Sequence, residues 1–591
     1  MRVSAAPRCA LLLLLLPLRL SVSSSPFLSD GGAQDAPGYL PRGVNGGFSC
    51  VGCVLVVSVV QQLAQVHNST VEKAMEMLCS YLPEKLYLKE ICHTVMEFFG
   101  PDLIKLLNHK VNADVVCHAL NLCTKEPGLP YCHAYHPPEE GLEASVRKAQ
   151  RRLRLRNLEA YSFCSLPFLR KICQKIEYAT DYNVPLEDFD RDNFSFVPSF
   201  RGYDWRGKDC NDLNSSVYPG RRPHDWDMKQ DSNCNGIWGV DPEDGIAYEK
   251  KFCEGTESKG IILLGDSAGA HFHIPDEWLM AEKMSLKAFS NLPLALSNEL
   301  DWPQFSGNTG FLNSSTGYFT DSTYLRLRDR NHCNHRDYQS ISKNGGSSRN
   351  LLTFVESLAR KKRLDKPAIV IYSMIGNDVC NGYTDTLAHM TTPEDMHSNV
   401  MQALRYLNSR LPEGSHVILQ GLVDGRFLWE HLHSRYHPIG QLNKDMTYEQ
   451  LYTFLNCLQV SPCNGWMSTN KTLRDLTSQR ASELSDVLKK IAMHKKFSSF
   501  DIFYVDFPLA KVNDEWHKMG GKPWQLVEPV DGFHPSQPAL AIGAKIVWEE
   551  VLQNWPHVFG KQNPFNKDIV NIFGDQGGHC LLKLESVPSS V

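Results

Sequence analysis

The 591-residue sequence predicts a multidomain fold: a small all-α domain cross-linked by disulfide bonds, then an α/β domain with helices on both faces of a parallel sheet. Three observations predict it. Six cysteines lie within residues 50–123, among segments whose apolar residues recur three and four positions apart, as on one face of a helix. From residue 260 onward, short apolar runs alternate with helical patterns, which is typical of parallel sheets. The chain is also longer than a single hydrophobic core usually organises.

Residues 1–25 predict a secretory signal peptide, because Arg2 and Arg8 accompany a short apolar run that is followed by small residues. We interpret residues 26–45 as a propeptide. No later run approaches the roughly 18 apolar residues needed to cross a bilayer, so no transmembrane segment is expected. The formal net charge of -5 argues against a nucleic-acid partner. We therefore expect a protein that is secreted or lumenal, in vesicles of the secretory pathway.

Two further features agree with that compartment. Sequons predict N-glycosylation at Asn68, Asn193, Asn214, Asn313 and Asn470. The chain has 18 cysteines, and most should be paired in an oxidising compartment. Because an odd number of them follows Cys9 of the signal peptide, at least one is unpaired or bonded outside this chain.

Residues 46–130 form the predicted helical domain. Its cysteines open with a Cys-x-x-Cys pair, continue with a middle pair and close with a third pair: Cys50, Cys53, Cys79, Cys92, Cys117 and Cys123. Spacing alone does not choose among the pairings that six cysteines allow, and a zinc site at the first pair is disfavoured by the secretory context. The pattern resembles saposin B-type domains. The resemblance implies the disulfides Cys50–Cys123, Cys53–Cys117 and Cys79–Cys92 and a lipid-binding role, against the alternative of a plain helical domain with an ordinary core.

Residues 131–156 read as a linker that contains the basic run Arg151–Arg156. We interpret this run as a protease site that divides a precursor, or zymogen, into a small and a large subunit. The alternative is a solvated helix face. If the chain is cut, a disulfide has to hold the halves together; Cys132 is the candidate on the small side, with Cys457 or Cys463 as its partner.

Residues 157–255 contain an Asp/Asn-rich stretch that predicts a structural calcium site. Oxygen ligands crowded at spacing two suit Ca²⁺ and do not suit zinc. The segment from Asp231 to Gly236 copies the beginning of an EF-hand loop, although no Glu closes it at the twelfth position. The alternative is a disordered acidic loop. The candidate ligands are Asp188, Asp190, Asp192, Asp209, Asp212, Asp225, Asp227, Asp231, Asn233 and Asn235.

Residues 256–591 form the predicted α/β domain. Its apolar runs predict strands at 261–264, 337–342, 368–373, 416–421 and 500–507, and its helical patterns lie at 350–362, 398–411 and 483–496. In a parallel sheet covered by helices, ligands bind at the carboxyl ends of the strands.

The first of these strands ends in Gly265-Asp266-Ser267-Ala268-Gly269, which fits two hydrolase signatures. One is the Gly-x-Ser-x-Gly elbow of α/β-hydrolases, but that elbow follows several earlier strands and Ser267 follows the first. The sequence instead resembles GDSL-type (SGNH) esterases, with Ala268 in place of Leu. Two more blocks match that family: Gly376-Asn377-Asp378, which lacks one middle residue, and Asp531-x-x-His534.

The resemblance implies a three-layer, flavodoxin-like fold and a role for each motif residue. Ser267 would be the nucleophile, His534 its base and Asp531 the group that orients the imidazole. The oxyanion hole would consist of the Ser267 N–H, the Asn377 side chain and the N–H of Gly346, which we choose over Gly345. We interpret His271 and His273 as pocket lining or core, outside the active site.

The order of all these parts resembles a family of secreted lipases that are cut into two disulfide-linked subunits. The resemblance implies that the substrate is bacterial lipopolysaccharide, and that the enzyme removes secondary fatty acyl chains from lipid A while contacting lipid peripherally. The residues themselves reach a serine esterase tethered to a lipid-handling domain. A phospholipase or lysophospholipase with the same triad is one alternative, and a non-catalytic lipid-transfer protein is another.

Overall fold

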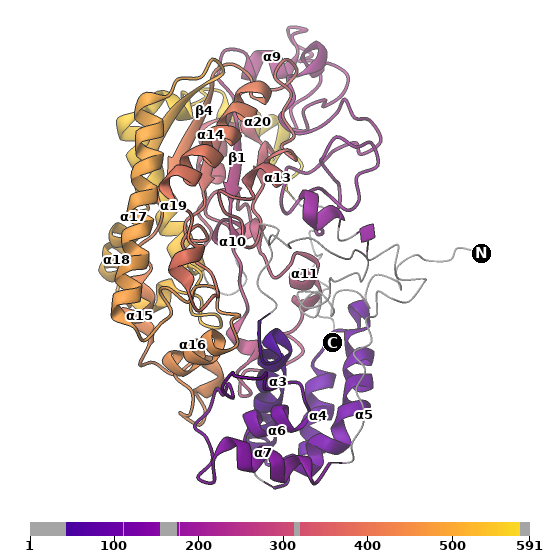
Figure 1. Cartoon of the computed structure of the whole chain (residues 1–591). Coiled ribbons are helices and arrows are strands. Elements are labelled where there is room, and N and C mark those ends of the chain that lie inside the picture. The colour runs from indigo at the N-terminus through magenta and orange to yellow at the C-terminus, as the bar shows by residue number, and fades with distance from the viewer. Residues whose placement is uncertain (1–42, 110, 154–173, 176–177, 313–318, 580–591) are drawn as a thin grey trace, which may run out of the picture.

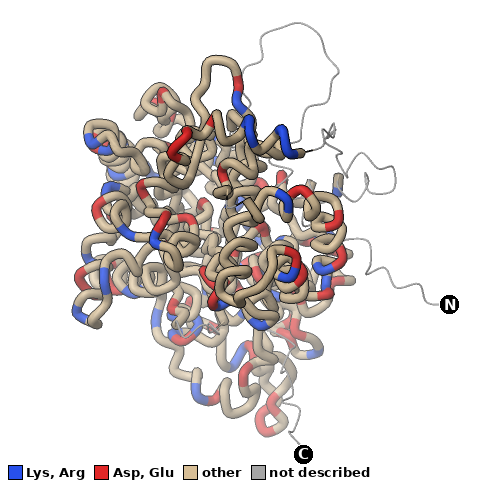
Figure 2. Tube along the Cα trace, turned by 90° about the horizontal axis from the view of Figure 1, so that it is seen from below, with Lys and Arg blue, Asp and Glu red and all other residues tan. Residues whose placement is uncertain are grey.

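The computed structural model describes residues 43–109, 111–153, 174–175, 178–312 and 319–579. The helical domain lies below a larger α/β domain (Figure 1). Seen from below, basic and acidic residues are interspersed along most of the described trace, in keeping with the small net charge (Figure 2). The signal peptide, nearly all of the expected propeptide, the sequon at Asn313 and residues 154–156 of the basic run lie outside the described residues; Arg151 and Arg152 come directly after a helix.

The helical domain forms because its apolar stripes are cross-linked in pairs. Thr70 and Asn112 cap the starts of two helices by accepting backbone N–H bonds. The disulfides Cys50–Cys123, Cys53–Cys117 and Cys79–Cys92 are present as the resemblance implies. The helices are α3 Gly47–Val66, α4 Val71–Ser80, α5 Leu88–Leu107, α6 Ala113–Ala119 and, within the linker, α7 Leu142–Gln150.

Helix α3 is, within the described ranges, the single helix long and apolar enough to cross a membrane by length and composition. Half of its most apolar window is buried inside the protein. The domain is attached to the α/β domain by the disulfide Cys132–Cys457, which selects one of the two expected partners. Cys463 is bonded to Cys380 instead.

The α/β domain is built on five parallel strands in the order β2-β1-β3-β4-β5. This is the flavodoxin-like sheet expected from the sequence. Ile262, Val370 and Val417 face one core, whereas Ile261, Ile369 and Ile418 face the other. Alternation of this kind gives three layers, because each face needs its own cover of helices. The strands are β1 Gly260–Gly265, β2 Tyr338–Ser340, β3 Ala368–Ser373, β4 Ser415–Gln420 and β5 Phe500–Val505.

Two groups of helices cover the sheet. Helices α14 (Pro393–Arg410) and α17 (Lys471–His494) pack on the first face, and α12 (Thr323–Arg330) and α19 (Gln537–Asn554) on the second. The remaining helices of this part are α9 Tyr248–Cys253, α10 Ser267–Ala270, α11 Leu292–Ser297, α13 Leu351–Val355, α15 Arg426–Leu432, α16 Tyr448–Cys457, α18 Leu509–Lys518 and α20 Asn566–Phe573.

Several element bounds differ from expectation, among them those of β2, α13 and α17. Strand β2 is only three residues long. Helix α13 ends at Val355, well before the expected end at residue 362. Arg360 lies beyond the helix and forms a buried ion pair with Asp337 at 2.6 Å. Helix α17 begins at Lys471, where Asn470 caps it, well before the expected start at residue 483. The sequence pattern does not predict these first turns because they are polar and show little helical periodicity.

The Asp/Asn-rich stretch is folded onto the edge of the sheet. The N–H of Ser340 on β2 donates to the Trp205 carbonyl at 2.7 Å, and the N–H of Gly207 donates to the Tyr338 carbonyl at 2.8 Å. The disulfide Cys210–Cys234 closes the stretch on itself. It is therefore an ordered cover for strand β2 and not a disordered acidic loop.

Candidate active site

Ser267 lies at the carboxyl end of β1, at the first position of the short helix α10. Asp266 caps that helix: one carboxylate oxygen accepts the N–H of Ala268 at 3.0 Å, and the other accepts the N–H of Ile375, just after β3, at 2.9 Å. Burial raises the pKa of Asp266 to about 6. The middle residue of the Gly-Asp-Ser block thus fixes the nucleophile's turn and ties it to the loop that bears Asn377.

The structure brings Ser267, His534 and Asp531 into one hydrogen-bonded chain. His534 Nδ1 lies 2.6 Å from Asp531 Oδ2, so that Nδ1–H donates to the carboxylate and Nε2 is left to accept the Ser267 hydroxyl at 2.7 Å. The second Asp531 oxygen accepts the N–H of His534 at 3.1 Å. Burial alone would lower the pKa of His534, but the nearby carboxylates, Asp531 first and then Asp266 and Glu528, together outweigh burial and the pKa is raised.

The two other expected oxyanion-hole residues behave differently. The Asn377 amide donates one N–H to the Gly346 carbonyl at 2.9 Å, and Asn377 lines the cavity beside Ser267. The N–H of Gly346 is donated to the Lys343 carbonyl at 2.8 Å, which closes a tight turn. Gly346 therefore acts in this structure as the acceptor that orients Asn377, and the expectation that its N–H faces an oxyanion is not met.

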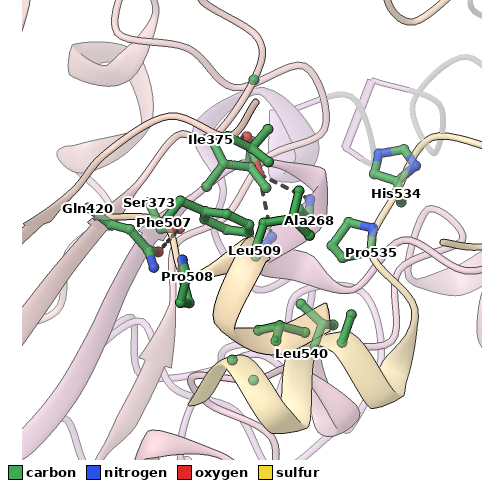
Figure 3. A pocket seen from close by; sticks show the side chains of 18 of the residues that line it. Ala268, Ser373, Ile375, Gln420, Phe507, Pro508, Leu509, His534, Pro535 and Leu540 are labelled. Atoms are coloured by element: carbon green, nitrogen blue, oxygen red, sulfur yellow. Dashed lines mark hydrogen bonds between the residues drawn. The ribbon is translucent and has the colours of Figure 1, made fainter. Parts of the chain in front are cut away.

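An apolar cavity of about 130 Å³ opens beside the triad. It lies between the carboxyl ends of β3, β4 and β5 and the helices α18 and α19 (Figure 3). Away from the triad, two of its polar lining residues are bonded to each other, since the Ser373 hydroxyl donates to Gln420 at 2.7 Å. The cavity suits a hydrocarbon chain better than a sugar or a peptide. Apolar residues that line it include Ile375, Phe427, Leu428, Trp466, Phe507, Leu509, Val512, Leu540 and Val547.

His271 and His273 lie close to the triad but do not line this cavity. His273 Nδ1 is 2.6 Å from the buried carboxylate of Glu528, and His271 Nε2 is 3.8 Å from it. Burial alone would raise the pKa of Glu528, but His273 and His271 lower it to about 2. Glu528 was not singled out in the sequence because no motif marks it; it joins the loop after Ser267 to the loop before Asp531.

Five of the expected calcium ligands come together. Asp188, Asp190 and Asp212 form one group of carboxylates within 4.8 Å of one another, and Asp190, Asp192 and Asp209 form a second that shares Asp190. Buried oxygens of Asp190, Asp192, Asp209 and Asp212 have no hydrogen-bond partner among the described residues. Burial raises the pKa of Asp192 to about 8 and that of Asp209 to about 7. Unpartnered buried carboxylates of this kind fit a hard cation such as Ca²⁺.

The other expected ligands lie elsewhere. Asp225 is exposed, whereas Asp227 is bonded to Ser232. The EF-hand-like residues Asp231, Asn233 and Asn235 form a separate buried cluster. Both amides of that cluster donate to Glu249 in α9, at 3.0 and 2.8 Å. No motif in the sequence predicts Glu249 as a partner, because it lies beyond the loop.

Comparisons with known proteins agree with this arrangement. The saposin-like domain family matches residues 49–174, and the family of GDSL-like lipases and acylhydrolases matches residues 261–547. The chain is 61% identical over 571 residues to the acyloxyacyl hydrolase of Homo sapiens, covering 96% of this chain and 98% of that protein. It is 59% identical to the acyloxyacyl hydrolases of Mus musculus and of Oryctolagus cuniculus, again over 96% of this chain and 98% of each.

Proposed function

Since the chain belongs to the acyloxyacyl hydrolase family and is an ester hydrolase, we propose that it removes secondary fatty acyl chains from the lipid A part of bacterial lipopolysaccharide. These are the chains esterified to the hydroxyl of another acyl chain. The observation that carries the proposal is the Ser267–His534–Asp531 chain of hydrogen bonds at the mouth of an apolar cavity.

The reaction begins when His534 Nε2 takes the proton of the Ser267 hydroxyl while the serine oxygen attacks the ester carbonyl. Asp531 stabilises the imidazolium that forms. The Ser267 N–H and the Asn377 amide donate to the oxygen that becomes negative. His534 then gives its proton to the leaving alkoxide, the hydroxyl of the acyl chain that stays on lipid A, and the acyl group remains on Ser267. Water, deprotonated by His534, then attacks the acyl carbonyl; the bond to the Ser267 oxygen breaks, His534 returns its proton to that oxygen, and the chain leaves as a free fatty acid.

The remaining parts support a lipid substrate. The acyl chain must leave a micelle or membrane before it reacts. The apolar cavity beside Ser267 buries the chain again, so that little of its apolar surface is exposed to water. Large apolar side chains of the helical domain are also exposed, among them Val56, Val95 and Phe98. We expect this domain to contact the lipid surface peripherally while Ser267 acts.

Calcium and processing complete the proposal. We expect Ca²⁺ at Asp188, Asp190, Asp192, Asp209 and Asp212, where it would neutralise buried carboxylates and stabilise the cover of β2; it takes no part in the ester chemistry. We also expect cleavage in the basic segment 151–156 during passage through the secretory pathway. The disulfide Cys132–Cys457 would then join the two subunits.

The test is mass spectrometry of products from purified lipopolysaccharide and, in parallel, from phospholipid, with wild type and Ser267→Ala. Wild type should remove the secondary chains and leave the hydroxyl-bearing chains on the sugar, and Ser267→Ala should remove none. Faster release from phospholipid would favour the phospholipase alternative. A fluorophosphonate probe that fails to label wild-type Ser267 would favour the lipid-transfer alternative.

A further inference from the structure

The loop of residues 528–534 carries Asp531 and His534. Two tyrosines and a histidine from outside the loop donate hydrogen bonds to its backbone carbonyls. The Tyr448 hydroxyl donates to the Pro529 carbonyl at 2.5 Å, His437 Nε2 donates to the Val530 carbonyl at 2.7 Å, and the Tyr452 hydroxyl donates to the Gly532 carbonyl at 2.6 Å. All three donor side chains are buried. We call His437, Tyr448 and Tyr452 the carbonyl clamp.

The backbone N–H groups of the same loop are bonded within it. The Gly532 N–H donates to the Glu528 carbonyl at 3.0 Å, the Glu528 N–H to the His534 carbonyl at 2.8 Å, and the His534 N–H to Asp531 at 3.1 Å. The loop therefore keeps its own shape, whereas the carbonyl clamp, together with the contact between Glu528 and His273, sets where the loop lies relative to Ser267.

The fit between the clamp and the loop is close. Gly532 has φ +61°, and a Cβ there would lie 2.8 Å from the Tyr448 ring, so no other residue fits at this position without displacement. The rings of His437 and Tyr448 meet edge to face at 5.4 Å. His437 Nδ1 accepts the Ile439 N–H at 3.3 Å, and burial lowers its pKa to about 4, so the imidazole is neutral and its Nε2 carries the donated hydrogen.

The segment that carries the clamp, residues 437–458, is also one of two surfaces on which the helical domain docks; at the other, Leu88 of α5 packs against Leu296 of α11. Gln62 in the middle of α3 donates to the Ile439 carbonyl, and Gln65 donates to Asn443 at 3.0 Å. The N–H of Val44, at the end of the expected propeptide, donates to the Leu458 carbonyl at 2.8 Å, and Cys457, the last residue of α16, forms the interdomain disulfide. The 3₁₀ turn Pro438–Gly440 packs against α3 where the two domains meet.

We propose that His437, Tyr448 and Tyr452 are positioning residues for the catalytic histidine, and that the saposin-like domain keeps them in place by docking on their segment. The proposal rests on the triad assigned above. Proton transfer requires the 2.7 Å contact between Ser267 and His534, and a displacement of about 1 Å at a reacting centre can cost roughly a hundredfold in rate. The helical domain thus contributes to catalysis even where the substrate is not a lipid assembly.

The first test uses Tyr452→Phe in the full chain with a water-soluble short-chain p-nitrophenyl ester. We expect kcat about tenfold lower with KM within about twofold, and a matching fall in the rate at which fluorophosphonate labels Ser267. Tyr338→Phe is the matched control, because its buried hydroxyl also donates to a backbone carbonyl, that of Tyr203, at 2.7 Å. It should lower stability similarly and leave kcat unchanged. Equal kcat in the two variants, at equal folded fraction, overturns the role of the clamp.

The second test asks whether docking matters, with the same soluble ester. Gln62→Met removes the bond to Ile439, and we expect kcat a few-fold lower. Gln61→Met is the control, because Gln61 donates to the Val111 carbonyl at 3.0 Å inside the helical domain. If both variants keep the wild-type kcat, the helical domain does not support the clamp. If wild type itself neither hydrolyses the ester nor reacts with the probe, the proposed function has failed, and not this inference alone.

Discussion

Asn377 should matter far more for the transition state than for the fold. In the ground state its side chain makes one hydrogen bond, to the Gly346 carbonyl at 2.9 Å, at a half-buried site, so Asn377→Ala should cost about 1 kcal/mol of stability. In the transition state the same amide would also donate to the oxyanion. Removing one such donor costs roughly 3–4 kcal/mol, so kcat should fall about 10²–10³-fold.

The assay is steady-state hydrolysis of a soluble ester together with chemical denaturation of the same preparations. Asn381→Ala is the matched control: Asn381 follows in the same loop, donates to the Thr386 carbonyl at 3.1 Å and accepts the Tyr383 N–H at 3.2 Å. It should lose a similar amount of stability and keep its kcat within about threefold. A fall of less than tenfold for Asn377→Ala, or one equalled by the control, would refute the assignment of Asn377 to the oxyanion hole.

Asp266→Ala should destabilise the protein by about 2–4 kcal/mol in chemical denaturation, because it removes a helix cap and the acceptor of the Ile375 N–H; a loss below about 1 kcal/mol would contradict this. Leu540→Trp should fill the cavity, so kcat/KM should drop at least about tenfold for dodecanoyl esters and little for butanoyl esters; equal losses would mean the cavity does not hold the acyl chain. In the folded state the pKa values of Asp192 and Asp209 are raised from 3.8 to about 8 and about 7, so both carboxyls stay protonated until the pH reaches these values. Calcium-free protein should therefore lose stability as pH rises through that window, and calcium should raise the melting temperature more at pH 8 than at pH 5; an equal rise at both would contradict the proposed site.

Much of the fold follows from local patterns in the chain. The apolar run before Gly265 predicts β1 because a strand buried on both faces needs consecutive apolar residues, and the chemistry of Ser267 follows from where that strand ends. The triad could be predicted for a related reason. In a parallel sheet the loops after different strands meet at one edge, so motifs that are distant in sequence can be assigned to one site.

Other features depend on contacts that no local pattern records. The hydrogen bond of the Gly346 N–H is set by the turn at Lys343, which a motif of small residues does not specify. The sequence left Cys457 and Cys463 as equal candidates for Cys132, because they lie in one short segment; only the packing of that segment sends Cys463 to Cys380. The sequence does not predict the roles of Glu249 and Glu528, because a lone buried carboxylate belongs to no motif and is recognised only by the side chains that it contacts in the fold.

The connection between β4 and β5 explains how lipid handling and ester chemistry can be joined in one chain. A crossover between parallel strands needs about a dozen residues, and α17 alone provides it. The residues before α17 do three other things. Phe427, Leu428 and Trp466 line the cavity, the clamp segment 437–458 holds the loop of His534, and the same segment receives the helical domain. Because one insertion lines the cavity, contacts the catalytic loop and receives the helical domain, it provides a direct route by which a change in how that domain sits reaches the reacting atoms.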